Sequence, residues 1–158
     1  PSPAPAPVRR VPRSPDRDPM IKPPPDWSDL IGIPFRVGGR TLDGLDCLGL
    51  VLEGLRRLGI EARDPWEDLR EEWQAGVRDI ALSAGEEWER IAAPVGGWRH
   101  PYGIRTGDVL VTGRDGTPSH VALALDPEIG LHTVECLTSH LLPHERVARR
   151  LLWVWRHK

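Results

Sequence analysis

The sequence predicts an α+β domain in which a helical N-terminal half packs on an antiparallel sheet. In the first half, apolar residues recur at spacings of three and four, which is the period of an amphipathic helix. In the second half, short runs of branched residues are separated by Gly, Pro or Asp, as is typical of strands. Helices first and strands later indicate the α+β class.

A turn, an extended segment and a loop are expected before the first long helix. Residues 26–32 predict a short helical turn with Asp26 or Ser28 as its N-cap. Residues 33–39 are expected to be extended and then to turn. Residues 41–46 are expected to form a loop.

The clearest helix is expected over residues 47–58. Four apolar side chains share one of its faces: Leu48, Val51, Leu55 and Leu58. Gly59 is a natural stop, because glycine readily adopts the left-handed conformation that ends helices. Residues 66–77 and 86–92 predict two further amphipathic helices, each with an internal tryptophan.

The second half predicts four strands. They are expected at residues 108–111, 120–125, 131–135 and 151–155. In the last of them, Trp153 and Trp155 share a strand face, where core packing is favoured over stacking on a glycan.

Composition excludes several classes of protein. The chain has 158 residues, of which 39% are hydrophobic and 28% charged, as in an ordinary globular domain. A formal net charge of −2 argues against a nucleic-acid partner. No stretch approaches the roughly 20 apolar residues of a membrane span. Two cysteines, Cys47 and Cys136, are too few for a disulfide scaffold.

The chain divides into a tail and one domain. Residues 1–25 hold ten of the 17 prolines and few apolar residues, which predicts a disordered or polyproline tail. This tail lacks the apolar stretch of a secretory signal peptide. Met20 is the single methionine and a candidate natural start. Residues 26–158 form the expected domain.

Cys47 is the candidate nucleophile. It opens the clearest predicted helix, directly after Asp46. The partial positive charge and free N–H groups of a helix N-terminus favour thiolate over thiol and can stabilise an oxyanion. Gly49 leaves room for close approach of a substrate or another strand. The alternative is that Cys47 is a small buried hydrophobic residue.

His120 and His132 are the candidate partners of Cys47. Each stands in a predicted strand, and histidines on adjacent antiparallel strands can come within hydrogen-bond reach. Thiol chemistry needs a base beside the sulfur and a third group that fixes the tautomer of the base. Each histidine taken alone favours a structural or surface role over a catalytic one, and the set of three in this order is far more specific.

These motifs together resemble those of NlpC-type cysteine peptidases. The resemblance covers residues 26 to about 135 and rests on IPFRVGG at 33–39, GLDCLGL at 44–50, GDVL at 107–110, SHV at 119–121 and His132. It implies a circularly permuted papain-like fold, with Cys47 as nucleophile, His120 as base and His132 as the residue that orients the base. It requires neither a metal nor an organic cofactor.

Three further residues flank the expected triad and are candidate substrate-binding residues: Phe35, Asp46 and Ser119. Many family members carry tyrosine where Phe35 stands, and phenylalanine cannot donate a hydrogen bond to an oxyanion. Asp46 is expected to tie down the loop before the helix by hydrogen bonding and is not assigned as a general base.

The resemblance implies hydrolysis of peptidoglycan stem peptides, at the bond between D-glutamate, through its γ-carboxyl, and the following diamino acid. The version DCLGL looks most like tail-associated peptidases of bacteriophages and gene-transfer agents. Phage tail proteins are therefore expected partners, and the virion tail, or the host cytoplasm before assembly, is the expected location. Two alternatives stay open: a structural tail-tip protein with a vestigial triad, and an amidase or acyltransferase that uses the same triad.

A metal site is the weakest candidate. His132, Cys136, His140 and His144 are spaced by four, which on one helix would form a metal-binding face. The segment instead predicts a strand followed by a loop, and Pro143 would break a helix. Cys136 is expected to be a structural thiol.

Overall fold

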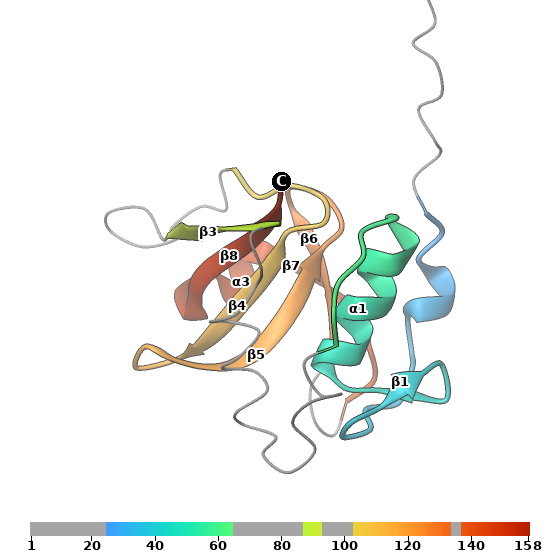
Figure 1. Ribbon diagram of the computed structural model, residues 1–158. Coiled ribbons are helices and arrows are strands. Elements are labelled where there is room, and N and C mark those ends of the chain that lie inside the picture. The colour runs from blue at the N-terminus through green and yellow to red at the C-terminus, as the bar shows by residue number, and fades with distance from the viewer. Residues whose placement is uncertain (1–24, 65–86, 93–102, 134–136) are drawn as a thin grey trace, which may run out of the picture.

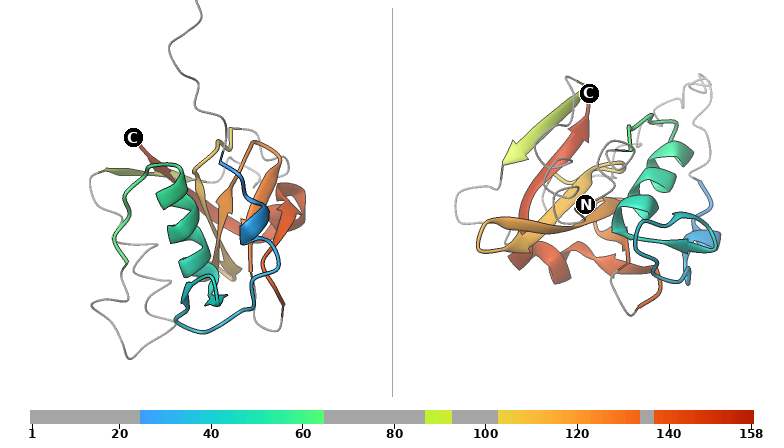
Figure 2. Two further views of the ribbon diagram at one scale, coloured as in Figure 1. Left: turned by 90° about the vertical axis from the view of Figure 1, so that its right-hand side faces the viewer. Right: turned by 60° about the horizontal axis from the view of Figure 1, so that its bottom comes forward.

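The computed structural model describes residues 25–64, 87–92, 103–133 and 137–158. A six-stranded antiparallel sheet with the strand order β3-β8-β4-β5-β6-β7 forms its centre. The strands are β3 (Trp88–Ala92), β4 (Val109–Arg114), β5 (Thr117–Ala124), β6 (Ile129–His132), β7 (His140–Pro143) and β8 (Leu151–His157). Helix α1 (Cys47–Arg57) lies beside β5 and β6 (Figures 1 and 2).

The core is divided by the alternation of side chains along the strands. Four residues of β4 and β5 pack with α1 on one face: Val109, Val111, Val121 and Leu123. Trp153 and Trp155 of β8 join this cluster and are each 8% exposed, so both tryptophans pack into the core. The opposite face packs Leu110, Ala122 and Val154 against the turn formed by α3 (His144–Val147) and η3 (Ala148–Arg150).

The predicted helix at residues 47–58 is confirmed. Asp46 is its N-cap, and Gly59 follows with a φ of +75°, in the left-handed region that glycine favours. The expected loop over residues 41–46 is wrong in detail, because β1 (Arg40–Thr41) and β2 (Gly44–Leu45) pair there as a small hairpin. This hairpin delivers the chain directly into α1.

The expected helix over residues 86–92 is wrong: Trp88–Ala92 is strand β3. It pairs with β8, with Trp88 opposite His157 and Ala92 opposite Trp153. The guanidinium of Arg90 lies 4.1 Å from the ring centre of Trp153, a cation–π contact across the two strands. Acidic residues and one tryptophan suggested a helix, but the pairing with a strand far along the chain decides the conformation.

Strand β7 and helix α3 were not expected. Residues 140–143 come after the strand expected at residues 131–135. They form β7 and pair with β6, with His132 opposite His140. The chain then turns into α3 at His144. Pro143 ends β7 at the edge of the sheet, where its missing N–H costs no ladder hydrogen bond.

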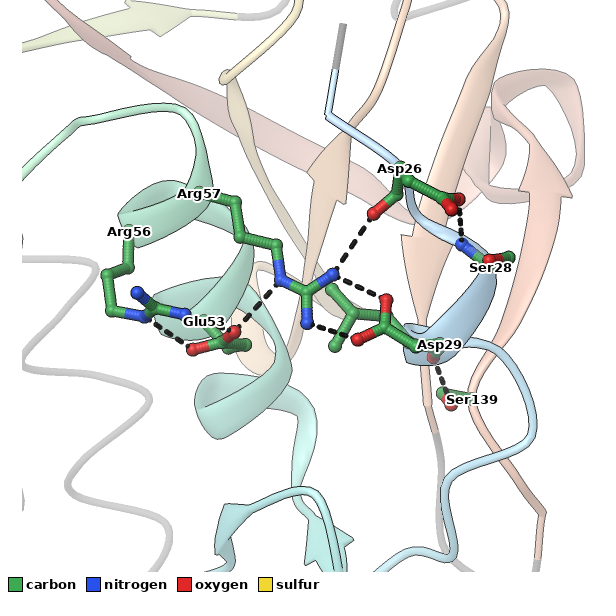
Figure 3. A network of polar contacts seen from close by, with 8 residues as sticks. Asp26, Ser28, Asp29, Glu53, Arg56, Arg57 and Ser139 are labelled. Atoms are coloured by element: carbon green, nitrogen blue, oxygen red, sulfur yellow. Dashed lines mark hydrogen bonds and ion pairs between the residues drawn. The ribbon is translucent and has the colours of Figure 1, made fainter.

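The N-terminal segment is tied to α1 by a polar network (Figure 3). The expected turn is present as η1 (Ser28–Leu30), but its N-cap is Trp27 rather than Asp26 or Ser28. Asp26 accepts a hydrogen bond from the Ser28 N–H at 2.9 Å. Arg57 binds Asp29 through two nitrogens, at 2.5 and 2.7 Å, and contacts Glu53 at 2.9 Å. This network fixes the segment that leads to the hairpin.

A buried ion pair joins β8 to the start of β4. Asp108 is 1% exposed and receives Arg156 Nε at 2.8 Å and Arg156 Nη2 at 2.6 Å. The Arg105 backbone N–H also donates to this carboxylate, at 2.8 Å. A bidentate ion pair of this kind fixes the relative orientation of the two side chains in addition to neutralising their charges.

We expect Asp108→Ala to lower the free energy of unfolding by about 3 kcal/mol, because it leaves the Arg156 charge without its buried partner. Urea unfolding followed by fluorescence measures the change. Asp43→Ala, at an exposed position, is the control and should change stability by less than about 0.5 kcal/mol. Equal effects of the two variants would contradict the structural role of the pair.

Several expectations lie outside the described residues. These are almost all of the proline-rich tail of residues 1–25, the helix over residues 66–77 and the environment of Cys136. Within the described ranges, no helix is long and apolar enough to cross a lipid bilayer.

Candidate active site

Asp46 organises the loop around Cys47. It is 1% exposed, and its Oδ1 accepts the Gly49 backbone N–H at 2.7 Å while Oδ2 accepts the Gly38 N–H at 2.9 Å. Arg40 Nη1 donates to Oδ1 at 2.8 Å, and Arg40 Nε binds Asp64 at 2.6 Å. The predicted hydrogen bonding of Asp46 is present. Both carboxylate oxygens are occupied within the protein, and substrate contact by Asp46 stays a prediction.

Gly49 is required by a backbone contact rather than by a substrate. A Cβ at Gly49 would lie 2.1 Å from the Gly39 carbonyl oxygen and 3.2 Å from Arg40 Nη1. Another segment of the chain therefore does approach Gly49 closely, as expected. That segment is the turn before β1. The first turn of α1 sits directly on this turn.

We expect Gly49→Ala to destabilise the protein by at least about 2 kcal/mol, because overpacking against fixed backbone shifts the first turn of α1. In an open helix the same substitution stabilises by up to about 1 kcal/mol. Thermal or urea unfolding therefore tests the sign of the effect. A variant as stable as the wild type would contradict the close packing at the start of α1.

Cys47 is the first residue of α1 and is buried, with 4% of its surface exposed. Burial raises the pKa of its thiol to about 11, and this effect exceeds the lowering by the nearby backbone N–H groups of Val121, Leu48 and Cys47. The expectation of a lowered pKa at the helix N-terminus is not met. The resting sulfur is a neutral thiol.

Val121 also places the sulfur relative to the first histidine. Cys47 packs in the same core cluster as Val121, which follows His120 on β5. In the described part of the chain, no hydrogen bond joins the sulfur to either imidazole. Catalytic hydrogen bonds are often long in unliganded proteins and tighten when substrate binds.

The two predicted histidines are brought together. His132 Nδ1 lies 3.4 Å from His120 Nε2, and the ring centres are 5.6 Å apart at an interplanar angle of 70°. The register pairs Leu123 with Leu131, so His120 lies diagonally across from His132 on the neighbouring strand. This contact uses the Nε2 atom of His120 and leaves its Nδ1 atom for another partner.

Both imidazoles are neutral at physiological pH. Burial is the main cause that lowers the pKa of His120 to about 3 and that of His132 to about 4, and neighbouring histidines lower both further. In the described chain, no carboxylate contributes to the pKa of either ring. A neutral imidazole has a free lone pair and can act as a base.

The remaining predicted residues lie at the margins of this cluster. Phe35 is half-buried and bridges Leu45, two residues before Cys47, so the aromatic position of the motif does stand next to the nucleophile segment. Ser119 is exposed and precedes His120 on β5. Contact of either side chain with substrate stays a prediction.

The histidines spaced by four along the chain do not gather at one point. His144 is buried, and its Nε2 donates to the Asp126 carbonyl at 3.0 Å. His140 instead packs on His132, with ring centres 4.3 Å apart. No group of three potential ligands within the described residues could hold a metal ion. Sequence reasoning did not connect His140 with the triad, because its strand was not expected.

Comparisons with known proteins bear on this arrangement. A model of the NlpC/P60 family matches residues 32–156, which is most of the chain. The chain belongs to the NlpC/P60 family. The matched region runs from the segment before the hairpin into β8 and includes Cys47, His120 and His132.

The fold is similar to that of a solved NlpC/P60 domain. The crystal structure of the NlpC/P60 domain of peptidoglycan hydrolase SagA matches with a TM-score of 0.54 and 22% sequence identity, over 81% of this chain and 90% of that chain. The α+β, papain-like fold expected from the sequence is thereby confirmed. A comparison with curated proteins found no match.

Proposed function

We propose that this NlpC/P60 protein is a cysteine peptidase that hydrolyses the stem peptides of peptidoglycan. The observation that carries the proposal is the 3.4 Å contact between His132 Nδ1 and His120 Nε2, next to a cysteine that opens a helix. This is the thiol, base and orienting group that nucleophilic acyl transfer needs. Membership of the family supports the proposal, as does the likeness to a domain of a peptidoglycan hydrolase.

The first step couples proton transfer to attack. Because the pKa of Cys47 is raised and that of His120 lowered, the resting pair is thiol and neutral imidazole. The thiol proton passes to His120 Nδ1 as the sulfur attacks the amide carbonyl. The Cys47 backbone N–H at the start of α1 stabilises the oxyanion. Phe35 offers no hydroxyl for this task.

The second half of the cycle returns the proton. His120 protonates the leaving amine, and a thioester remains on Cys47. Water, deprotonated by His120, then hydrolyses the thioester and restores the thiol. His132 accepts the hydrogen bond of His120 Nε2–H throughout, which keeps His120 Nδ1 directed to the reacting atoms.

The finer specificity rests on the sequence motifs. We assign cleavage to the bond between the γ-carboxyl of D-glutamate and the following diamino acid, on the resemblance of the motifs alone. The association with phage tails rests on the DCLGL sequence at residues 46–50 and stays a prediction, as does the location of the protein.

The raised pKa of Cys47 predicts a pH dependence of alkylation. Below pH 11, the thiolate fraction and thus the rate with iodoacetamide should rise about tenfold per pH unit. Near pH 7, the rate should fall below that of glutathione. A Cys136→Ser variant leaves Cys47 as the only thiol for this measurement. A rate that is already constant between pH 6 and 8 would contradict the neutral resting thiol.

Digestion of purified peptidoglycan tests the proposed function. Walls of several chemotypes are incubated with the wild type, and the soluble fragments are identified by mass spectrometry. New stem-peptide ends at the D-γ-glutamyl bond are expected. Cleavage at another peptide bond would support the peptidase activity and revise its specificity. If no chemotype of peptidoglycan released fragments, the proposal would be overturned.

A further inference from the structure

His140 is a third histidine beside the two proposed catalytic imidazoles, and its ring contacts that of His132. Strands β5, β6 and β7 are adjacent, and they place His120, His132 and His140 in a row. His140 lies directly opposite His132 in the β6–β7 register, and the two rings pack at an angle of 57° with centres 4.3 Å apart. The motifs that carry the family resemblance assign no role to His140.

Among the residues that the structure describes, none gives the ring of His132 a second hydrogen bond. If His120 uses Nδ1 toward the thiol, its Nε2 carries a proton and donates to His132 Nδ1. The neutral His132 ring must then carry its own proton on Nε2. That Nε2 atom is buried and has no hydrogen-bond partner among the described residues. Among the described residues, packing is thus the contact that orients the Nε2 side of this ring.

His140 is well placed to supply that packing because its own position is fixed. Its Nδ1 donates to the Thr138 carbonyl at 2.8 Å. The residues before it are pinned to the N-terminal segment: Thr138 bridges Pro34, and the Ser139 hydroxyl donates to the Leu30 carbonyl at 2.6 Å. The His140 ring is thus held in place, and the His132 ring packs against it.

We propose that His140 is a positioning residue that holds His132, and through it His120, in the orientation needed for catalysis. This inference rests on the proposed function of the Cys47, His120 and His132 cluster. His140 also contributes to the lowered pKa values of both other histidines, so the three rings are electrostatically coupled. Supporting residues that orient catalytic imidazoles are commonly needed for full activity.

Three variants separate ring packing from hydrogen bonding. His140→Ala removes both, His140→Phe keeps a planar ring, and His140→Asn keeps a polar group near the Thr138 carbonyl but no ring. We expect His140→Ala and His140→Asn to lower kcat about tenfold with an unchanged KM, and His140→Phe to retain most of the activity. A wild-type kcat in His140→Ala, or a loss in His140→Phe as large as in His140→Ala, would overturn the proposal.

A measurement without substrate keeps the inference distinct from the peptidase proposal. Nitrogen-15 NMR of the histidine rings should show His132 as a single Nε2–H tautomer in the wild type and in His140→Phe. It should show a mixture of tautomers in His140→Ala, under conditions where thermal unfolding shows all variants folded. An unchanged tautomer in His140→Ala would overturn the positioning role, whereas inert peptidoglycan digests would overturn only the proposed function.

Discussion

Replacing Cys47 with alanine should reduce peptidoglycan hydrolysis by at least about 10⁴-fold, because no other group in the proposed site can form the thioester. Cys47→Ser should be nearly as inactive, since a hydroxyl in the same buried position has a much higher pKa than the thiol and its neighbouring base is weak. Release of stem-peptide fragments, quantified by mass spectrometry, measures both variants.

Cys136→Ser is the matched control for this experiment, because it removes the second cysteine of the chain and leaves the proposed nucleophile in place. It should retain wild-type activity. Cys47 is part of the core cluster, so unfolding temperatures must accompany the rates. A folded Cys47→Ala variant that still released the same fragments would refute the assignment of the nucleophile.

Replacing His120 with alanine should reduce kcat by about 10³-fold, the usual contribution of a general base and acid. The loss falls on kcat rather than KM, because His120 acts on the proton of Cys47 and on the leaving amine. Steady-state kinetics on a synthetic stem peptide separates the two constants. A variant whose KM alone rises would place His120 in substrate binding instead.

The matched comparison is at His132, where the expected effect depends on the side chain introduced. Asparagine keeps an oxygen that can accept the hydrogen bond of His120 Nε2–H, so His132→Asn should lose about tenfold in kcat. Alanine removes the acceptor, and His132→Ala should lose about 10²-fold. Equal losses in the two variants would show that hydrogen bonding at His132 does not orient the base.

The elements that surround the nucleophile could be predicted from local sequence. Asp46, the apolar face of α1 and Gly59 specify a helix with its start and its end, and all three lie within one stretch of the chain. The branched runs of β4, β5 and β8 are equally local signals. The order of Cys47, His120 and His132 along the chain then identified the candidate site.

The features that could not be predicted depend on contacts between distant segments. Residues 88–92 form a strand because β8 pairs with them, and no local period distinguishes this from a helix. The pKa of Cys47 is raised because β4, β5 and β8 bury it, which outweighs the helix terminus visible in the sequence. His140 joins the cluster only through the register of β6 and β7.

The most direct test of the central claim is detection of the acyl-enzyme. A stem-peptide substrate is mixed with the wild type and quenched in acid within milliseconds, and the digested protein is analysed by mass spectrometry. The account predicts a thioester adduct on the peptide that contains Cys47, which rises and decays with turnover and is missing from Cys47→Ala. Turnover with no adduct on Cys47 at any time, or an adduct on another residue, would contradict it.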